Sequence, residues 1–454
     1  MSGYRTRSLM MSVAEAAAGL ISKPVRRQLD RFIFEEPDLE RFGARVPLGV
    51  LLRSLKEEAD LSAFGALATR ADVALRLATL RRFHDEETRE PGILEEPIAA
   101  PIFITGLPRS GTTFLQSILA EDPDNRVLRC WEVLYPYPDR NRACGRDTRL
   151  ARFDRQIRYF HLLTPDLHKV HPLNGSSPQE CTEVAAHVFQ SLRFDSTYNV
   201  PSYRKWLDRK GHRAAYEFHK RFLQHLQHQQ GARRWVLKSP DHVFALGALK
   251  STYPDARIVF MHRDPVKVMP SNAQLIEILR AVFSRTSNPM EVGRQTVDDL
   301  TLGAAKMIEA SRRDTFAGGS VFHLQFLDLT ARPLDAVERL YRHFGLKLKA
   351  AARERMARHI AAKPNGGYAR SNYTPHRHGI DPDDVTARFA SYMSYFDIPR
   401  ERAKQPVARV PARSPSRRTS GLRLKQPPRP GRRKRKRTRF DSKARHVTGL
   451  CAGS

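Results

Sequence analysis

Residues 101–119, PIFITGLPRSGTTFLQSIL, contain the side chains of this sequence that are best suited to binding an anion. Gly106 and Gly111 allow the backbone to bend and to approach a ligand closely. Arg109 adds a positive charge, and the hydroxyl-rich residues after it are expected to begin a helix, whose first N–H groups bind anionic oxygen. The stretch is therefore predicted to cradle a phosphate or sulfonate group with Ser110, Gly111, Thr112 and Thr113.

The same residues nearly form the loop of nucleoside-triphosphate-binding proteins. That loop reads G-x-x-x-x-G-K-[ST], whereas Gly106–Thr113 reads G-x-x-x-x-G-T-T, with Thr112 in place of the lysine. Triphosphate chemistry uses the lysine on the β- and γ-phosphates. Its absence argues against a P-loop nucleotide kinase or NTPase, which we keep as the alternative class of enzyme.

A second anion site is predicted at the end of another apolar run, within ARIVFMHRDPVKVMPSN at 256–272. The run is predicted to be a strand, and Pro265 suits the first turn of a following helix. Arg263 would then emerge at the carboxyl end of its strand, which is the ligand edge of an open α/β sheet. Ser271 lies eight residues further on, about two turns along the predicted helix.

Three segments together resemble the sulfotransferases that use 3′-phosphoadenosine 5′-phosphosulfate (PAPS). TGLPRSGTTFL resembles their 5′-phosphosulfate loop, which reads PRSGT in many bacterial and Golgi-type members, with arginine at the position of Arg109. The segment with Arg263 and Ser271 has the form of their 3′-phosphate motif, Arg-Asp-Pro and then a serine eight residues after the arginine. FLDLTARPLDAVERLYRHFGL at 326–346 resembles a later family segment, and the resemblance extends over about 100–400.

This resemblance implies an enzyme that moves a sulfuryl group from PAPS, as co-substrate, to a hydroxyl of a small-molecule, glycan or glycolipid acceptor. The cradle would hold the 5′-phosphosulfate, while Arg263 and Ser271 would hold the 3′-phosphate. Arg109 and Lys238 would stabilise the transferring group. Lys238 ends the apolar run RWVLK and is therefore predicted at the same sheet edge. This chemistry demands no metal, and no metal site is predicted.

A base must also take the proton of the acceptor. The resemblance favours Glu132, about twenty residues after the loop, because a glutamate at this place is the proposed base in several bacterial sulfotransferases. Glu180 and His187, on a helix predicted to border the acceptor, are the alternatives. Three further histidines are spaced poorly for one face of a polar helix and are interpreted as solvated: His219, His225 and His228.

The patterns of apolar residues predict the elements that must position these side chains. Residues 1–95 are predicted to be mainly helical, and from residue 101 onward short strands alternate with helices. This order predicts an α/β fold, in which a P-loop-like parallel sheet is flanked by helices and helical inserts border the acceptor. The predicted strands are 101–105, 234–237, 256–261 and 320–325, the helices after them are 111–121, 240–252, 265–280 and 333–344, and the inserts are 178–192, 212–230 and 291–313.

Charge divides the chain into a body and a tail. Of the formal net charge of +30, residues 401–454 supply +16, from 18 Lys/Arg and 2 Asp/Glu. This segment shows no apolar periodicity, so we predict a disordered basic tail. The predicted domains are an N-terminal helical segment (1–95), a sulfotransferase α/β domain (96–400) and the tail (401–454). Binding to nucleic acid or to an anionic membrane surface, through the tail, is the alternative function outside enzymes.

Two further features bear on location and acceptor. No apolar run approaches the roughly 18 residues that a membrane span needs, and the four cysteines show no spacing typical of zinc sites or disulfide frameworks. We therefore expect no transmembrane segment and a cytoplasmic protein. Tyr198, Tyr203 and Trp206, in the wider helical region 150–230 that is expected to line the acceptor pocket, are candidates for stacking on a sugar or holding an apolar chain, or else they belong to the core.

Overall fold

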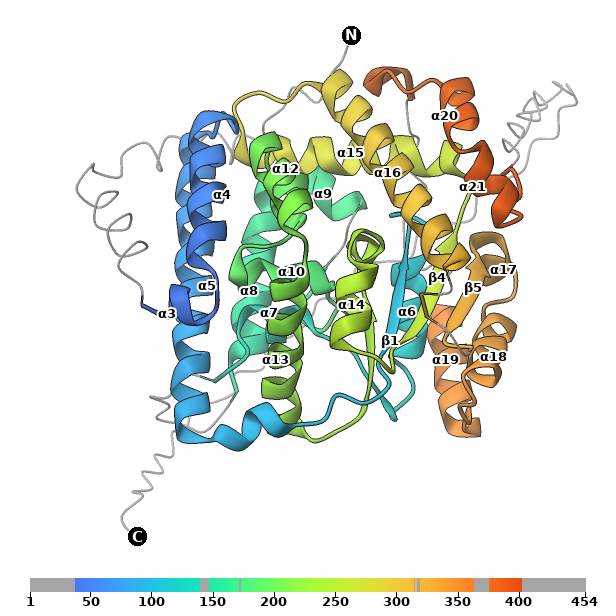
Figure 1. The fold of residues 1–454 in the computed structure, drawn as a ribbon, viewed down its shortest axis with the longest axis horizontal. Helices are drawn as coiled ribbons and strands as arrows, with labels where there is room; N and C mark the ends of the chain where they lie inside the picture. Colours follow the sequence, from blue (N-terminus) through green and yellow to red (C-terminus); the bar gives the residue numbers. More distant parts are fainter. Residues whose placement is uncertain are drawn as a thin grey trace, which may run out of the picture. The chain divides into compact units, whose positions relative to one another are not determined.

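The computed structural model describes residues 37–138, 147–170, 173–313, 315–316, 319–362 and 375–401. Within these residues the chain forms a five-stranded parallel sheet with the strand order β2-β3-β1-β4-β5 (Figure 1). Helices cover the sheet, so the predicted α/β fold is confirmed. The strands are β1 (Ile102–Gly106), β2 (Asn125–Arg126), β3 (Arg234–Lys238), β4 (Arg257–His262) and β5 (Val321–Gln325).

The register of the sheet brings three chain segments to one edge. β1 lies between β3 and β4, with Ile104 opposite Lys238 and Gly106 opposite Met261. Because the strands are parallel, their carboxyl ends meet at the same edge. The loop after Gly106, the end of β3 at Lys238 and the residue after β4, Arg263, therefore lie side by side there.

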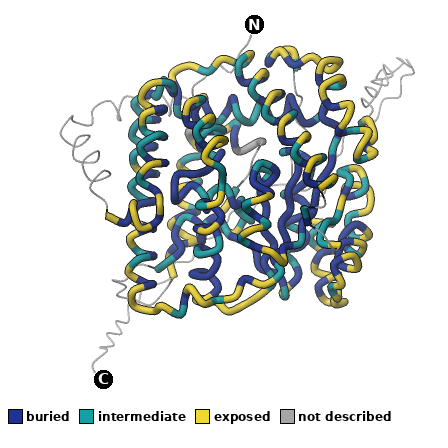
Figure 2. Tube along the Cα trace, viewed as in Figure 1, coloured by how far each residue is buried: buried dark blue, intermediate teal, exposed yellow. Residues whose placement is uncertain are grey.

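The side chains of β1 alternate between two apolar clusters, as the period of a strand requires. Ile102 and Ile104 pack with α6 (Thr112–Leu119), α18 (Pro333–His343) and α19 (Ala350–Ala362). Phe103 joins the larger cluster on the other face, with α13 (Arg213–Gln230) and α14 (Leu246–Thr252). All five residues of β1 are buried, and Figure 2 shows the strands as part of the dark-blue interior.

Long helices complete the larger cluster, and their starts follow local sequence signals. α15 (Pro265–Phe283) begins with proline at its first position, and the Asp264 side chain accepts a hydrogen bond from Val266 N at 3.0 Å. α16 (Pro289–Arg312) begins in the same way after Asn288. The other helices are α3 (Asp38–Arg41), α4 (Arg45–Glu57), α5 (Ala63–Arg89), α7 (Cys130–Leu134), α8 (Arg149–Leu163), α9 (Pro165–Val170), α10 (Cys181–Ala185), α11 (Arg193–Thr197), α12 (Pro201–Lys210), α17 (Phe326–Ala331), α20 (Pro382–Arg388) and α21 (Ala390–Tyr395), with 3-10 helices η1 (Pro91–Glu95), η2 (Ala186–Val188), η3 (Pro240–Phe244) and η5 (Pro375–His378).

The predicted strands agree with the structure to within one residue at each end, but one predicted helix is wrong. Residues 178–192 form only the short α10 and η2, because Phe189 adopts a left-handed backbone with φ of 55° that ends the helical run. The helix predicted at 240–252 starts as a 3-10 turn and continues as α14 after Ala245. β2, which has two residues, was not predicted.

Contacts divide the chain into two units, Met1–Glu401 and Arg402–Ser454. The predictions made for residues 1–36 and for the basic tail after Glu401 lie outside the described residues. The described part of the N-terminal segment is helical, as expected, and its longest helix is α5. Glu87 of α5 forms an ion pair with Arg221 of α13, which joins this segment to the body of the first unit.

Candidate active site

The loop between β1 and α6 has a left-handed backbone at three residues. The φ angles of Gly106, Arg109 and Gly111 are 138°, 62° and 90°. A Cβ atom on Gly106 would lie 2.3 Å from the carbonyl oxygen of Met261 in β4, so only glycine fits there. Arg109 is a non-glycine residue in this region, a strain of about 1–3 kcal/mol that the surrounding contacts must offset. The loop therefore opens α6 at Thr112, at the predicted sheet edge.

The hydroxyl groups of the loop have different surroundings. Ser110 is buried and its Oγ donates to the carbonyl oxygen of Leu107 at 2.6 Å, so this hydroxyl helps to shape the turn. Thr112 is also buried. The Thr113 hydroxyl instead accepts a hydrogen bond from Lys238 Nζ at 3.2 Å. The loop is thus joined to the end of β3.

Lys238 is buried and pairs with a carboxylate. Its side chain is 1% exposed, and its Nζ forms an ion pair with Glu180. A buried ammonium group is costly unless it is paired, and Glu180 supplies that partner. Glu180 lies in extended backbone directly before α10, and its own side chain is 28% exposed. The structure thus brings together Thr113, Lys238 and Glu180, the last being an alternative base from the sequence.

Arg263 holds an anionic group in this structure. Its Nε and Nη2 donate to the two carboxylate oxygens of Glu401 at 2.7 and 3.1 Å, while Nη1 donates to the carbonyl oxygen of Arg109 at 2.7 Å. The guanidinium group also lies over the Phe326 ring, 3.8 Å from its centroid. Glu401 N in turn donates to Asp264 at 2.9 Å. The arrangement shows that a two-oxygen anion fits against Arg263.

Arg109 connects the loop to α15. Its Nε donates to Ser271 Oγ at 2.9 Å. Together with the bond from Arg263 to the Arg109 backbone, this contact gathers Arg109, Arg263 and Ser271 at one place on the sheet edge. The residues predicted to bind the two ends of one ligand are therefore neighbours in space.

Glu132 has other surroundings. It is buried at the start of α7, where its Oε2 accepts from the backbone N of Arg129 at 3.1 Å. Its Oε1 accepts from Gln230 at 3.0 Å and from Arg126 at 3.5 Å. These contacts join α7 to the end of α13 and to β2. The carboxylate thus caps α7 and satisfies buried donors around that helix.

The predicted interpretation of the histidines on α13 is wrong for two of them. His219 and His225 are 3% and 0% exposed, whereas the side chain of His228 is 38% exposed and pairs with Glu96. His225 lies between the Tyr137 hydroxyl at 2.6 Å and Glu87 at 2.9 Å. The apolar positions of α13, Phe218, Phe222, Leu223 and Leu226, show which face is buried, and this pattern had been visible in the sequence.

His187, the third candidate base, is fully buried. Its Nε2 lies 3.0 Å from the carbonyl oxygen of Val133, and its ring stacks on Phe222. Burial lowers the pKa of His187 to about 3, so the ring is neutral at pH 7. A neutral imidazole among aromatic rings is typical of core packing.

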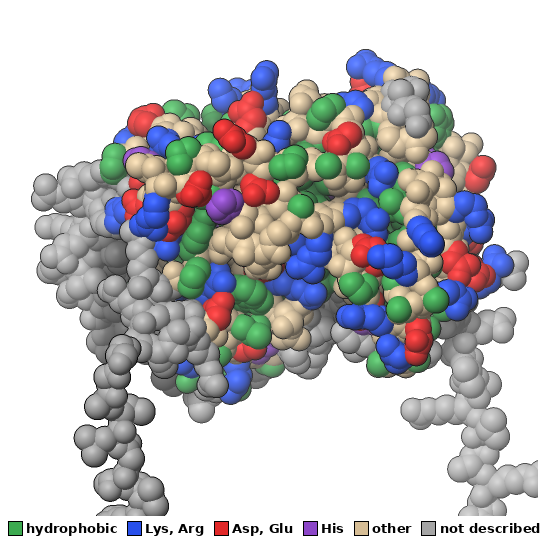
Figure 3. Space-filling view, turned by 90° about the horizontal axis from the view of Figure 1, so that it is seen from below, with side chains coloured by type: hydrophobic (Ala, Val, Ile, Leu, Met, Phe, Trp, Pro, Cys, Tyr) green, Lys and Arg blue, Asp and Glu red, His purple; other side chains and the backbone are tan. Residues whose placement is uncertain are grey.

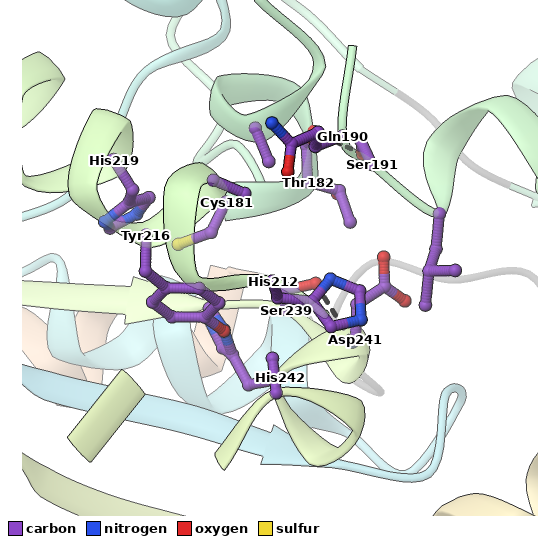
Figure 4. A pocket seen from close by; sticks show the side chains of 14 residues that line it. Cys181, Thr182, Gln190, Ser191, His212, Tyr216, His219, Ser239, Asp241 and His242 are labelled. Atoms are coloured by element: carbon purple, nitrogen blue, oxygen red, sulfur yellow. Dashed lines mark hydrogen bonds between the residues drawn. The ribbon is translucent and has the colours of Figure 1, made fainter. Parts of the chain in front are cut away.

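The aromatic candidates for the acceptor side belong to the core instead. Tyr198 and Tyr203 are 1% and 0% exposed, and the Tyr203 hydroxyl donates to the carbonyl oxygens of Phe189 and Ser191. Trp206 is half-buried against the same cluster. A pocket is lined by residues of the predicted inserts 178–192 and 212–230 and by residues after β3 (Figure 4). Its lining includes Cys181 and Thr182, which follow Glu180, and Ser239 and Asp241, which follow Lys238.

The described residues contain no group of three or more His, Cys, Asp or Glu side chains placed to hold a metal ion. None of the helices in the described ranges is both long and apolar enough to cross a membrane. On the face drawn in Figure 3, Lys and Arg side chains lie among Asp and Glu side chains, without a continuous basic groove.

A parallel sheet whose central strand ends in a glycine-bearing loop, with Arg109, Lys238 and Arg263 converging on it, defines a P-loop-like α/β protein with a candidate anion site. The model of the sulfotransferase family matches residues 101–350, more than half of the chain. This chain therefore belongs to the sulfotransferase family and is a transferase, as its sequence suggested.

Relatives of known sequence or structure agree with this assignment. The omega-hydroxy-beta-dihydromenaquinone-9 sulfotransferases Stf3 of Mycobacterium bovis and Mycobacterium tuberculosis are 24% identical over 257 residues, which are 54% of this chain and 63% of theirs. The chain thus covers less than two thirds of these relatives. The crystal structure of sulfotransferase STF1 from M. tuberculosis H37Rv superposes with a TM-score of 0.68 and 28% identity, over 84% of this chain and 97% of that one. STF9 from Mycobacterium avium shares the fold, with a TM-score of 0.71 and 23% identity over 88% and 99%.

Proposed function

We propose that this protein transfers a sulfuryl group from PAPS to a hydroxyl of a small-molecule, glycan or glycolipid acceptor. One observation supports it most directly. Lys238 Nζ contacts both Thr113 of the loop, at 3.2 Å, and the carboxylate of Glu180. This cluster would supply a cation for the transferring group and a base for the acceptor. It lies where the loop would bind the phosphosulfate end of the donor.

The proposed donor site consists of two neighbouring parts. The loop residues Ser110, Gly111, Thr112 and Thr113 would bind the 5′-phosphosulfate through the start of α6. Arg263 and Ser271 would bind the 3′-phosphate, with Arg109 between the two parts. The two hydrogen bonds from Arg263 to the Glu401 carboxylate support this 3′-phosphate site. A guanidinium group that binds a carboxylate through two hydrogen bonds can bind a phosphate in the same way.

The proposed reaction is a single displacement at sulfur. The acceptor oxygen forms a bond to sulfur as the bond from sulfur to the phosphate oxygen breaks, and the electron pair of that bond leaves with the phosphate. Lys238 and Arg109 would balance the charge that grows on the leaving phosphate. The acceptor proton would pass to a carboxylate.

We favour Glu180 over Glu132 as this base. The Glu180 carboxylate is partly exposed and contacts the lysine that meets the loop, whereas Glu132 accepts three hydrogen bonds from groups around α7. Release of Glu180 from Lys238, when the lysine turns to the donor, would leave a carboxylate beside the reacting oxygen. His187 is buried among aromatic rings, which speaks against a proton-transfer role.

A hydroxyl acceptor agrees with the names of the relatives. Stf3 is named for an omega-hydroxylated dihydromenaquinone. The similarity covers only part of that protein, so we take from it the hydroxyl group as acceptor and not the particular lipid.

The donor site can be tested by calorimetric titration with 3′-phosphoadenosine 5′-phosphate (PAP), the desulfated product, in the absence of magnesium. We expect PAP to bind the wild-type protein and AMP, which lacks the 3′-phosphate, to bind at least about 100-fold more weakly. Arg263→Ala should lose this discrimination. A preference for ATP that requires magnesium would contradict the proposal and favour a nucleotide kinase or NTPase.

The base can be tested with two isosteric variants. Glu180→Gln should lower kcat by at least about 100-fold, the usual contribution of a general base. It should also remove the acidic limb of the pH–rate profile, which a merely structural role would leave in place. Glu132→Gln is the matched control, and it should retain kcat within a few-fold while lowering the melting temperature. The reverse result would identify Glu132 as the base.

A further inference from the structure

A pocket of about 40 Å³ is lined by chain neighbours of Lys238 and Glu180. Its lining includes the residues that directly follow each of them in the chain, Ser239 after Lys238 and Cys181 after Glu180. One water needs roughly 10–15 Å³ of such space, so the pocket can hold a few waters or a hydroxyl-bearing carbon group of similar size. Its place suits the part of an acceptor next to the reacting oxygen.

Three polar atoms around this pocket have no partner. In the part of the chain that the structure describes, no group forms a hydrogen bond with Gln190 Oε1, His219 Nε2 or His242 Nε2. All three side chains line the pocket, and they are 3%, 3% and 2% exposed. Buried polar atoms are nearly always hydrogen-bonded, so unpartnered atoms around one cavity indicate groups that a ligand completes.

The other nitrogen of each histidine is already engaged. His219 Nδ1 lies 2.7 Å from the Tyr253 hydroxyl, and His242 Nδ1 is bonded to the Tyr216 hydroxyl. These contacts hold both rings in place, and each Nε2 has no hydrogen-bond partner among the described residues. Figure 4 shows His219, Tyr216 and His242 on one side of the pocket and Gln190 on another.

The charges of the lining decide which ligand the pocket suits. No lysine or arginine is among its lining residues. Burial lowers the pKa of His219 to about 3, and it also lowers that of His242, so both rings are neutral. Asp241 adds a carboxyl group. An anionic headgroup would meet no lysine or arginine in this lining, and the nearby Lys238 is already paired with Glu180. An uncharged hydroxyl, by contrast, can both donate and accept hydrogen bonds.

We propose that this pocket binds hydroxyl groups next to the one that is sulfated, so that the acceptor carries a neutral polyol or sugar headgroup. Gln190, His219 and His242 would contact these neighbouring hydroxyls. A lone alcohol at the end of an apolar chain would leave the same three groups without partners. The inference rests on the proposed sulfotransferase reaction and names the class of its acceptor.

Matched acceptors test this inference. Octyl β-D-glucoside, 1-O-octylglycerol and 1-octanol share one alkyl chain and differ in the hydroxyls beside the reacting one. With radiolabelled PAPS, we expect kcat/KM for the first two to exceed that for 1-octanol by at least about 100-fold, because a site built to bond a hydroxyl rejects an analogue that lacks it. Equal values for the three acceptors, or a preference for 1-octanol, would overturn the inference.

Two variants test the residues. Gln190→Met removes Oε1 with little change in volume, and His219→Asn keeps a polar atom for Tyr253 while removing Nε2. Each should raise KM for octyl β-D-glucoside by about 10-fold or more, while PAP affinity stays unchanged. Gln116→Met is the control, because Gln116 is buried with an unpartnered Oε1 but lies outside the pocket lining.

The outcomes separate two failures. If wild-type protein binds no PAP, the proposed function is wrong and the acceptor inference falls with it. If PAP binds and 1-octanol is sulfated as well as the glucoside, only the inference about the pocket is wrong. Unchanged KM values in both variants would show that the pocket holds structural water only, which also overturns it.

Discussion

Glu401 forms an ion pair with Arg263, the residue that we propose to bind the 3′-phosphate. Its two oxygens lie 2.7 and 3.1 Å from nitrogens of Arg263, and the two side chains are 15% and 21% exposed. A ligand phosphate at this position must displace the carboxylate. The internal anion therefore competes with the donor, and the free energy of the Arg263–Glu401 pair is subtracted from donor binding.

Removal of this carboxylate should tighten PAP binding. A partly exposed pair contributes up to about 1 kcal/mol, so we expect Glu401→Gln to lower the Kd for PAP about fivefold. AMP, without a 3′-phosphate, should bind as before. Glu354→Gln, which breaks the exposed pair with Arg358, serves as the control in the same titrations. An unchanged PAP affinity in Glu401→Gln would place the 3′-phosphate elsewhere.

Asp241 should make stability depend on pH. Burial, with the Glu180 carboxylate as the second cause, raises its pKa to about 7 in the folded protein, well above the value near 4 of an unfolded chain. The folded state thus holds this proton more tightly, and the stability it contributes is lost as the pH rises from about 4 to above 7. The full loss amounts to at most about 4 kcal/mol.

The asparagine in Asp241→Asn cannot ionise, so this variant should not lose stability as the pH rises. We expect the variant to unfold at higher urea concentration than the wild type at pH 8, and the difference should shrink toward pH 5. Asp383→Asn, at an exposed position at the start of α20, should show no such trend. A difference between Asp241→Asn and wild type that is constant over this range would show that Asp241 ionises normally in the folded protein.

Some residue contacts followed from the sequence and others did not. Arg109, Arg263 and Ser271 were expected at one edge because strand ends and helix starts are visible as apolar runs and prolines, and their side chains do meet. Their roles toward PAPS are still proposals. The pair between Lys238 and Glu180 spans 58 residues and depends on an extended segment that no local pattern specifies. The choice between Glu180 and Glu132 could not be made without that contact.

At the scale of elements, α10 is held in place by a buried network. Arg76 of α5 is 1% exposed, and it bonds to Asp72 at 3.1 Å and to Glu183 of α10 at 2.9 Å. Arg193 pairs with the same two carboxylates. Since Glu183 lies one helical turn after Glu180, this network also fixes the start of α10, where the proposed base stands.

Loss of Arg76 should therefore affect both stability and turnover. Breaking a buried pair from one side leaves a charge without its partner, so we expect Arg76→Met to lower the free energy of unfolding by about 3 kcal/mol. We also expect kcat to fall while the Kd for PAP changes little. Arg81→Met, at an exposed position on the same helix, is the control for urea unfolding and kinetics. Full activity in Arg76→Met would show that α10 is positioned by apolar packing alone.

The elements themselves were predictable where apolar patterns are long. β1, β3 and β4 were predictable because their nearly continuous apolar runs are typical of buried parallel strands. β5 is more exposed, and its apolar residues are interrupted by His323. The run at 178–192 is apolar enough for a helix, yet Phe189 takes a left-handed conformation, with the Tyr203 hydroxyl accepting from Ser191 N at 2.9 Å. Tertiary contacts of this kind override local propensity and leave no local signal.

At the scale of the whole chain, positive charge is densest after the described unit. The described unit ends at Glu401, and the segment 402–454 contains 18 Lys/Arg against one acidic residue, Asp441. The face of the first unit in Figure 3 mixes both signs of charge. Binding to polyanions is therefore expected from the segment 402–454, while binding of PAP is expected from the first unit.

A chain shortened to residues 1–401 tests polyanion binding and PAP binding separately. It keeps the Glu401 carboxylate. We expect its Kd for PAP and its kcat to match those of the full chain within about twofold, because each residue proposed for the donor site precedes the cut. Retention on a heparin column should fall steeply, since removing cations lowers the number of counterions released on binding. A loss of PAP binding on truncation would contradict this division.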